Sequence, residues 1–186
     1  MNSTFHIAVL ASGTGTTLQA LIDNQQEYGY HVALVITNRE CKALERAAQH
    51  HIPTLQTKDW EMIDHALTDH PIQLIVLAGF LAIIPQWICE KWEKRIINIH
   101  PSLLPKHGGK GMYGIRVQES VLTSGDTEAG CTVHDVSAEI DGGSILAQER
   151  VPIEADDTPE SLSLRVQQAE KTLLPTTIGK LKDTAL

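Results

Sequence analysis

The chain has 186 residues, of which 42% are hydrophobic and 20% are charged, and its formal net charge at pH 7 is −8. This balance is typical of a globular chain, and at roughly 150 residues per domain the length predicts one domain over residues 1–186. A negative net charge disfavours non-specific nucleic-acid binding, so an anionic ligand would need a local binding device.

Neither a membrane segment nor a leader is expected. The longest apolar run, residues 74–84, is much shorter than the ~20 residues that cross a bilayer. The N-terminus has no basic flank or cleavage site of a signal peptide. Three widely spaced cysteines without a C-x-x-C pair indicate neither disulfides nor zinc. These features predict a cytoplasmic protein.

The first hundred residues alternate predicted strands with predicted helices. Short apolar or β-branched runs predict strands at residues 6–11, 31–37, 52–55, 73–78 and 95–100. Helical spacing or strong helix formers predict helices from about Leu18, at residues 42–50, from an Asp59 cap to about residue 69, and from Pro85 to Trp92. This alternation predicts an α/β fold, a Rossmann-like, doubly wound and mostly parallel sheet.

The pattern changes after residue 100. A Pro- and Gly-rich loop over residues 101–112 precedes a predicted helix at 115–124. The predicted strands 130–136 and 144–151 are joined by so short a connection that an antiparallel C-terminal pair is expected. Thr158 is expected to cap a final helix that has Pro159 at its first position.

A glycine-rich turn, Ser12–Thr17, connects the first predicted strand to the first predicted helix. Backbone N–H groups in such a turn bind phosphate, although a tight turn without a ligand is an equally good interpretation. A dinucleotide site is a third interpretation, in which Arg39 would meet a 2′-phosphate and Glu40 a ribose. The fingerprint for it is incomplete, because Leu18 occupies the place of the third glycine.

Polar side chains gather at the end of one predicted strand. Asn98 and His100 are two positions apart, so both side chains leave the same face of the strand, at the sheet edge where open α/β sheets bind ligands. An amide and an imidazole can polarise a carbonyl and carry a proton, but a strand-end histidine bonded to a loop carbonyl is the commoner arrangement. Asp141 either belongs to a simple turn or pairs with His100. His134, on a predicted strand, is the other histidine of interest.

The segment Asn98-Ile99-His100-Pro101-Ser102-Leu103-Leu104-Pro105, with Asp141-Gly142-Gly143 downstream and Ser12-Gly13-x-Gly15-x-x-Leu18-Gln19-Ala20 at the front, carries a family likeness. It resembles the phosphoribosylglycinamide formyltransferases, the 10-formyltetrahydrofolate-dependent glycinamide ribonucleotide (GAR) transformylases of purine synthesis. The likeness runs from Ile7 to about Pro175. Related methionyl-tRNA and sugar-nucleotide enzymes share the first segment but carry a further C-terminal domain, so the length favours the GAR enzymes.

The resemblance implies a formyltransferase fold and a set of functional residues. The implied catalytic residues are Asn98, His100 and Asp141. The residues implied to bind GAR are Gly15, Thr16, Thr17, Gln167 and Glu170. The residues implied to bind folate are Leu81, Ala82, Ile83, Ile84, Asn98, Ser137, Ala138, Glu139, Ile140 and Asp141.

The sequence also departs from the family pattern. Thr17 stands where the family often has Asn, and Leu81-Ala82 stands where Met-Arg is common. The Arg that meets the glutamate of the folate has no counterpart in residues 53–70, and Lys110 is the expected replacement.

The implied activity is transfer of a formyl group from 10-formyltetrahydrofolate, as co-substrate, to the amine of GAR. No metal, nucleic acid or membrane is expected to take part, and the expected partners are the two small molecules and, in a homodimer, a second copy of the chain; a monomer is the other alternative. Two rival hypotheses remain: a nicotinamide-dependent oxidoreductase of Rossmann type, and a non-catalytic folate- or phosphate-binding relative.

Overall fold

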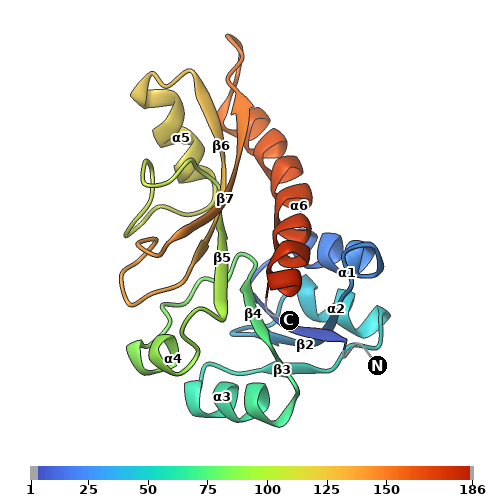
Figure 1. The fold of residues 1–186 in the computed structure, drawn as a ribbon. Coiled ribbons are helices and arrows are strands. Elements are labelled where there is room, and N and C mark those ends of the chain that lie inside the picture. The colour runs from blue at the N-terminus through green and yellow to red at the C-terminus, as the bar shows by residue number, and fades with distance from the viewer. Residues whose placement is uncertain (1–3, 185–186) are drawn as a thin grey trace.

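The computed structural model describes residues 4–184, which form a seven-stranded sheet with helices on both faces (Figure 1). The strands are β1 (Phe5–Ala11), β2 (Tyr30–Thr37), β3 (Thr54–Gln56), β4 (Leu74–Leu77), β5 (Ile96–His100), β6 (Glu128–Asp135) and β7 (Ile145–Pro152). The helices are α1 (Thr16–Tyr28), α2 (Lys42–Gln49), α3 (Trp60–Asp69), α4 (Gln86–Lys91), α5 (Ile115–Ser124) and α6 (Pro159–Thr184).

The strand order is β3-β2-β1-β4-β5-β6-β7. The first five strands of this order run parallel, whereas β6 is antiparallel to both β5 and β7. This confirms the predicted mostly parallel sheet with an antiparallel C-terminal pair. The predicted strands 52–55, 130–136 and 144–151 differ from β3, β6 and β7 by at most two residues at either end, because strand ends depend on pairing with a neighbour.

The central strands β1 and β4 are almost entirely apolar because each face of the sheet packs against helices there. In β1, the side chains of Ile7 and Val9 belong to a core that also contains residues of α1, α2, α5 and α6. Ala8 and Leu10 point to the opposite core, which α3 and α4 complete. The continuous apolar run near the N-terminus therefore arises because strand β1 is buried on both faces.

Two predicted helix caps are confirmed, and one predicted helix start is wrong. Asp59 accepts hydrogen bonds from the N–H groups of Glu61 and Met62 at the start of α3, and Thr158 accepts one from Ser161 N–H at the start of α6. Pro85 precedes α4 instead of opening it. Its ψ of 146° is extended, so the first helical residue is the next one, Gln86.

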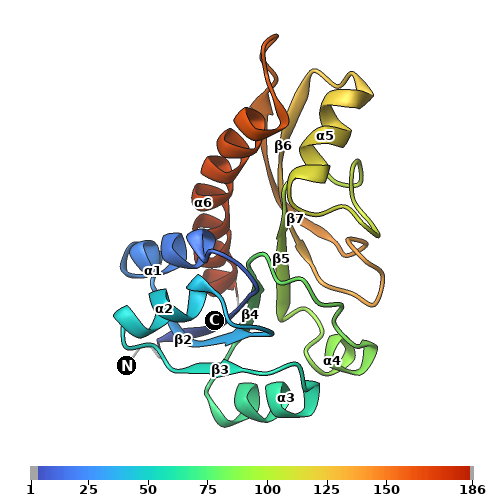
Figure 2. The ribbon, with the colours of Figure 1, turned by 180° about the vertical axis from the view of Figure 1, so that it is seen from behind.

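Helix α6 packs across the sheet from the antiparallel strands β6 and β7 to helix α1 (Figures 1 and 2). It runs beside β6 and β7 and also packs against α1 and α5. Leu162, Val166, Leu174 and Ile178 are fully buried along this helix. Within residues 4–184, no helix combines the length and the apolar character that a membrane span requires.

Candidate active site

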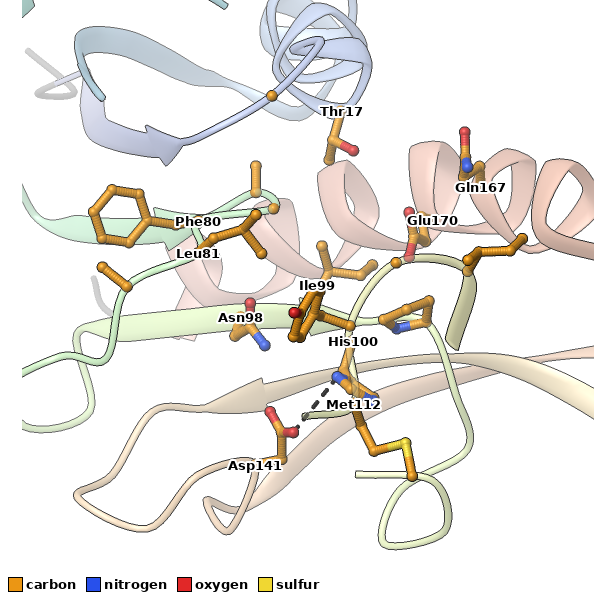
Figure 3. Close-up of a pocket in the computed structure, with 18 of the residues that line it drawn as sticks. Thr17, Phe80, Leu81, Asn98, Ile99, His100, Met112, Asp141, Gln167 and Glu170 are labelled. Carbon is orange, nitrogen blue, oxygen red and sulfur yellow. Dashed lines mark ion pairs between the residues drawn. The ribbon is translucent and has the colours of Figure 1, made fainter. Parts of the chain in front are cut away.

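A cavity of about 850 Å³ opens at the carboxyl ends of β1, β4 and β5 (Figure 3). Residues 13–17, 78–83, 98–101 and 109–115 line it, together with side chains of α6. A smaller cavity of about 140 Å³ adjoins it, because Asn98 and Asp141 line both. The ends of parallel strands thus form a hollow where open α/β sheets place their ligands.

The structure brings every predicted site residue to one of these two cavities. Those that line the larger cavity are Gly15, Thr16, Thr17, Leu81, Ala82, Ile83, Asn98, His100, Ile140, Asp141, Gln167 and Glu170. Those that line only the smaller cavity are Ile84, Ser137, Ala138 and Glu139. The predicted residues therefore share one continuous region, although they come from both ends of the chain.

The glycine-rich turn presents the N-terminus of α1 to the larger cavity. Gly15 precedes the helix with φ of 69°, a left-handed conformation that favours glycine, and no side chain caps the helix. The N–H groups of the first turn have no partner within a helix. Thr16 and Thr17 line the cavity beside them. This arrangement can hold an anion through backbone N–H groups and two hydroxyls.

Two arginines stabilise the glycine-rich turn by donating hydrogen bonds to its backbone carbonyls. Arg39 donates from Nε to the carbonyl of Ser12 at 2.6 Å, and Arg46 donates from Nε to the carbonyl of Thr14 at 2.8 Å. Neither side chain lines either cavity. Arg39 is therefore a structural residue here, not the 2′-phosphate contact that a dinucleotide site would need. Leu18 is fully buried in the core, which gives the third glycine position a packing role.

Asn98, His100 and Asp141 meet at the junction of the two cavities. His100 ends β5 and is 4% exposed. Its Nδ1 lies 3.6 Å from Oδ2 of Asp141, which lies between β6 and β7 (dashed line in Figure 3). Asp141 also accepts a hydrogen bond from the N–H of Gly109 at 2.9 Å. An amide, an imidazole and a carboxylate are thus within reach of one bound group.

His134 completes this cluster from the neighbouring strand. It lies opposite Asn98 in the pairing of β5 with β6, and its Nε2 is 3.1 Å from Nδ2 of Asn98. Its Nδ1 faces the carbonyl of Asp135 at 2.8 Å. A carbonyl only accepts, so Nδ1 carries the hydrogen and Nε2 accepts from the amide. Burial lowers the pKa of His134, in keeping with a neutral ring. His134 therefore fixes which way the Asn98 amide points.

The loop after β5 contributes the contact that is the commoner arrangement for a strand-end histidine, a bond to a loop carbonyl. Nε2 of His100 lies 2.9 Å from the carbonyl oxygen of His107. Since that oxygen only accepts, Nε2 must carry a hydrogen, and in the neutral ring Nδ1 then holds the free lone pair. Every residue has a carbonyl, so the sequence predicted a loop carbonyl as partner but not that it belongs to His107.

Glu170 is the buried acid of the site. It lies on α6, 8% exposed, and lines the larger cavity near Gln167 (Figure 3). Burial raises the pKa of Glu170 to about 7. The side chain can therefore present either a donor or a carboxylate to a polar ligand near neutral pH.

Positive charge is scarce around the cavities. Among the described residues that line them, Lys110 is the only Lys or Arg. It is exposed on the loop of residues 109–115, which lines the larger cavity. Within residues 4–184, no three His, Cys, Asp or Glu side chains are grouped as metal ligands.

The model of the formyl transferase family matches residues 5–178. The chain belongs to this family. It is 41% identical over 183 residues to the trifunctional purine biosynthetic protein adenosine-3 of Chironomus tentans, which covers 91% of this chain and 13% of that protein. This formyl transferase chain spans less than a fifth of each trifunctional relative.

Two further formyl transferases match over most of the chain. The chloroplastic phosphoribosylglycinamide formyltransferase of Arabidopsis thaliana is 37% identical over 189 residues, covering 94% of this chain and 64% of that protein. The crystal structure of phosphoribosylglycinamide formyltransferase from Anaplasma phagocytophilum superimposes with a TM-score of 0.91 at 36% identity, covering 98% of this chain and 89% of that one. The sheet and its helices are therefore those of the formyltransferase fold.

Proposed function

We propose that this formyl transferase moves the formyl group of 10-formyltetrahydrofolate to the amine of 5′-phosphoribosylglycinamide (GAR). The observation that carries the proposal is the meeting of Asn98, His100 and Asp141 where the two cavities join. The names of the Arabidopsis and Anaplasma relatives support the choice of GAR as acceptor.

The reaction needs no nucleophile from the protein, because the GAR amine itself attacks the formyl carbon. The new C–N bond forms as the carbonyl oxygen becomes an oxyanion. The bond from this carbon to N10 of the folate then breaks, and N10 takes up a proton as the amine loses one. The site must therefore stabilise an oxyanion and carry one proton between two nitrogens.

His100 is suited to carry that proton. The His107 carbonyl holds the hydrogen on Nε2, so the lone pair on Nδ1 faces Asp141 and can accept the amine proton. After Nδ1 is protonated, both ring nitrogens face acceptors, one a carbonyl and the other a carboxylate. Asp141 therefore stabilises the imidazolium before its proton passes to N10.

Asn98 is suited to bind the oxyanion. Its amide nitrogen donates one hydrogen to His134, which leaves the second for the formyl oxygen. Removing one such donor typically costs about 3–4 kcal/mol of transition-state stabilisation. His134 acts through Asn98 by fixing the orientation of this amide.

The two ends of the site suit the two substrates. The N-terminus of α1, with Thr16 and Thr17, would hold the GAR phosphate, and Glu170 with Gln167 would meet its hydroxyl groups. The smaller cavity would hold the flat pterin ring between Leu77, Ile84 and the 137–141 loop. A backbone anion site also agrees with the net charge of −8, because it needs no basic surface.

The direct test is an assay with purified chain, GAR and 10-formyltetrahydrofolate, in which tetrahydrofolate release is followed optically and formyl-GAR is measured by mass spectrometry. We expect both products in equal amounts. Tetrahydrofolate with free formate would mean that water is the acceptor. A folded chain that binds 10-formyltetrahydrofolate but releases nothing would overturn the proposal and favour a non-catalytic binding protein.

His100→Ala tests the assigned chemistry. It should lower kcat by about 100- to 10,000-fold, because the proton carrier is lost, with little change in the Kd for GAR. His65→Ala, an exposed position on α3, is the matched control and should keep full activity. If His100→Ala retained near-normal turnover, the role given to His100 would be wrong.

A further inference from the structure

The main chain of His107 contacts His100, the proposed catalytic histidine, and the ring of His107 contacts Ser120 and Asp126. Its carbonyl oxygen accepts from Nε2 of His100 at 2.9 Å. Its Nδ1 lies 2.8 Å from Oγ of Ser120 on α5, and its Nε2 lies 2.9 Å from Oδ2 of Asp126 just before β6. The side chain is 12% exposed. Both ring nitrogens of His107 are therefore held by groups outside the loop.

The backbone at His107 needs such support. Its φ of 55° is left-handed, a conformation that costs a residue with a Cβ roughly 1–2 kcal/mol. Relaxation to a negative φ would rotate the peptide and take the carbonyl away from His100. Asp141, the other loop residue that faces His100, has φ of 54°. Strained non-glycine residues of this kind persist where the surrounding structure holds them.

Asp126 binds the ring of His107 and also the side chain of the residue before it. Its Oδ1 lies 2.6 Å from Nζ of Lys106, and its Oδ2 faces His107. The hydrogen bond from His107, followed by that from Lys106, lowers the pKa of Asp126 to about 2. The carboxylate is thus charged at every working pH and holds the two successive residues Lys106 and His107.

We infer that His107 is a positioning residue for the formyl transfer: Ser120 and Asp126 hold its ring, and this contact keeps its carbonyl on Nε2 of His100. The carbonyl selects the tautomer of His100 that leaves the lone pair on Nδ1, facing Asp141 and the larger cavity. The inference rests on the proposed function of His100 as proton carrier. It extends the site to a residue that touches neither substrate.

The test compares His107→Phe, which keeps a flat ring without its nitrogens, with Lys106→Met, which removes the Lys106–Asp126 pair and leaves the ring of His107 in place. We expect kcat of His107→Phe to fall about 10- to 100-fold, as a displaced catalytic group does. The KM values for GAR and for 10-formyltetrahydrofolate should change less than about threefold. Lys106→Met should keep full kcat. His107→Gln, whose amide can donate to Asp126, should recover part of the loss.

A second readout needs no turnover. In chain labelled with 15N-histidine, the ring nitrogen shifts report which nitrogen carries the hydrogen, and the spectrum of His100→Ala assigns the His100 signals. We expect wild-type His100 to be in the Nε2–H form when neutral and His107→Phe to show a mixture of tautomers. This readout stands even if the wild-type chain fails the turnover assay, so the failure of the two proposals can be told apart.

Two outcomes would overturn the inference. One is a His107→Phe variant with wild-type kcat and an unchanged His100 tautomer. The other is a fall in kcat that follows a loss of folded protein while the tautomer of His100 stays the same, since that would be a merely structural effect. If His107→Phe does not fold, Asp126→Ala, which removes the acceptor for Nε2 of His107, carries the same two measurements with His107 intact, and an unchanged tautomer and kcat there would also overturn it.

Discussion

Asp141 lies between two imidazole rings, with Oδ2 at 3.6 Å from Nδ1 of His100 and Oδ1 at 3.7 Å from Nε2 of His134. The two rings come from the adjacent strands β5 and β6, and the carboxylate comes from the loop that follows β6. Burial lowers the pKa of His134 and favours the neutral ring with its lone pair on Nε2, whereas Nδ1 of His100 is the atom that gains a proton in the proposed transfer. The charge of Asp141 therefore faces both rings: it raises the pKa of His134 against the larger effect of burial, and it is placed to stabilise an imidazolium at His100.

Asp141→Asn should separate charge from shape at this position. The amide keeps the size of the side chain and can still accept from Gly109 N–H, but it no longer stabilises an imidazolium. We expect kcat to fall by about two orders of magnitude, with the KM for GAR little changed. The measurement is steady-state turnover over a range of pH. Asp156→Asn, an exposed position, serves as control, and a similar modest loss in both variants would count against a role for the charge.

The sequence predicted much of this site because part of its geometry is local. Asn98 and His100 share a strand face by their spacing, and the glycine-rich turn lies beside them because parallel strands end at one edge. The apolar runs of β1 and β4 followed from burial on both faces. These features depend on periodicity and on general rules of sheet topology, which a single sequence records.

The remaining geometry depends on backbone conformation, which a single sequence does not record. Asp141 approaches His100 through a left-handed residue in a loop, and neither residue type nor spacing indicates that contact. His107 acts through a carbonyl that any residue would have. Arg39 is the converse case, since its position suggested a 2′-phosphate contact, whereas its guanidinium binds the carbonyl of Ser12.

Gly15→Ala should destabilise the fold, whereas Gly13→Ala should not. A Cβ at Gly15 would lie 2.8 Å from Cα of Ala43, and its φ of 69° is unfavourable for alanine. A Cβ at Gly13 meets no atom within 4 Å, and its φ is not left-handed. We expect Gly15→Ala to lower the free energy of unfolding by at least about 1 kcal/mol and Gly13→Ala to change it little. Urea unfolding of the two variants makes the comparison, and equal stabilities would contradict it.

The three cysteines should differ in reactivity. Cys89 and Cys131 are buried, and burial raises the pKa of both thiols, that of Cys131 to about 12. Cys41 is partly exposed before α2. Because the thiolate is the reactive form, iodoacetamide should alkylate Cys41 first in the folded chain and all three cysteines in urea. Peptide mass spectrometry over time reads the order; early labelling of Cys131 in folded protein would show that the core around it opens.

The buried Glu170 should make stability depend on pH in a defined window. Burial raises its pKa from an ordinary value of 4.5 to about 7. A group whose pKa is raised by folding contributes its stability fully below its unfolded pKa and loses it as pH rises through the folded pKa. The wild-type chain should therefore lose roughly 3 kcal/mol of unfolding free energy between these two pKa values because of Glu170 alone.

Glu170→Gln removes this pH-dependent contribution to the free energy of unfolding and nearly keeps the volume of the side chain. The variant should gain stability relative to wild type steadily from about pH 4.5 to pH 7, and the difference should become constant above that range. Urea unfolding of both proteins at several pH values measures it, with the exposed Glu160→Gln on the same helix as control. A difference between Glu170→Gln and wild type that is independent of pH would mean that Glu170 stays charged, which requires water or a cation to reach it through the larger cavity.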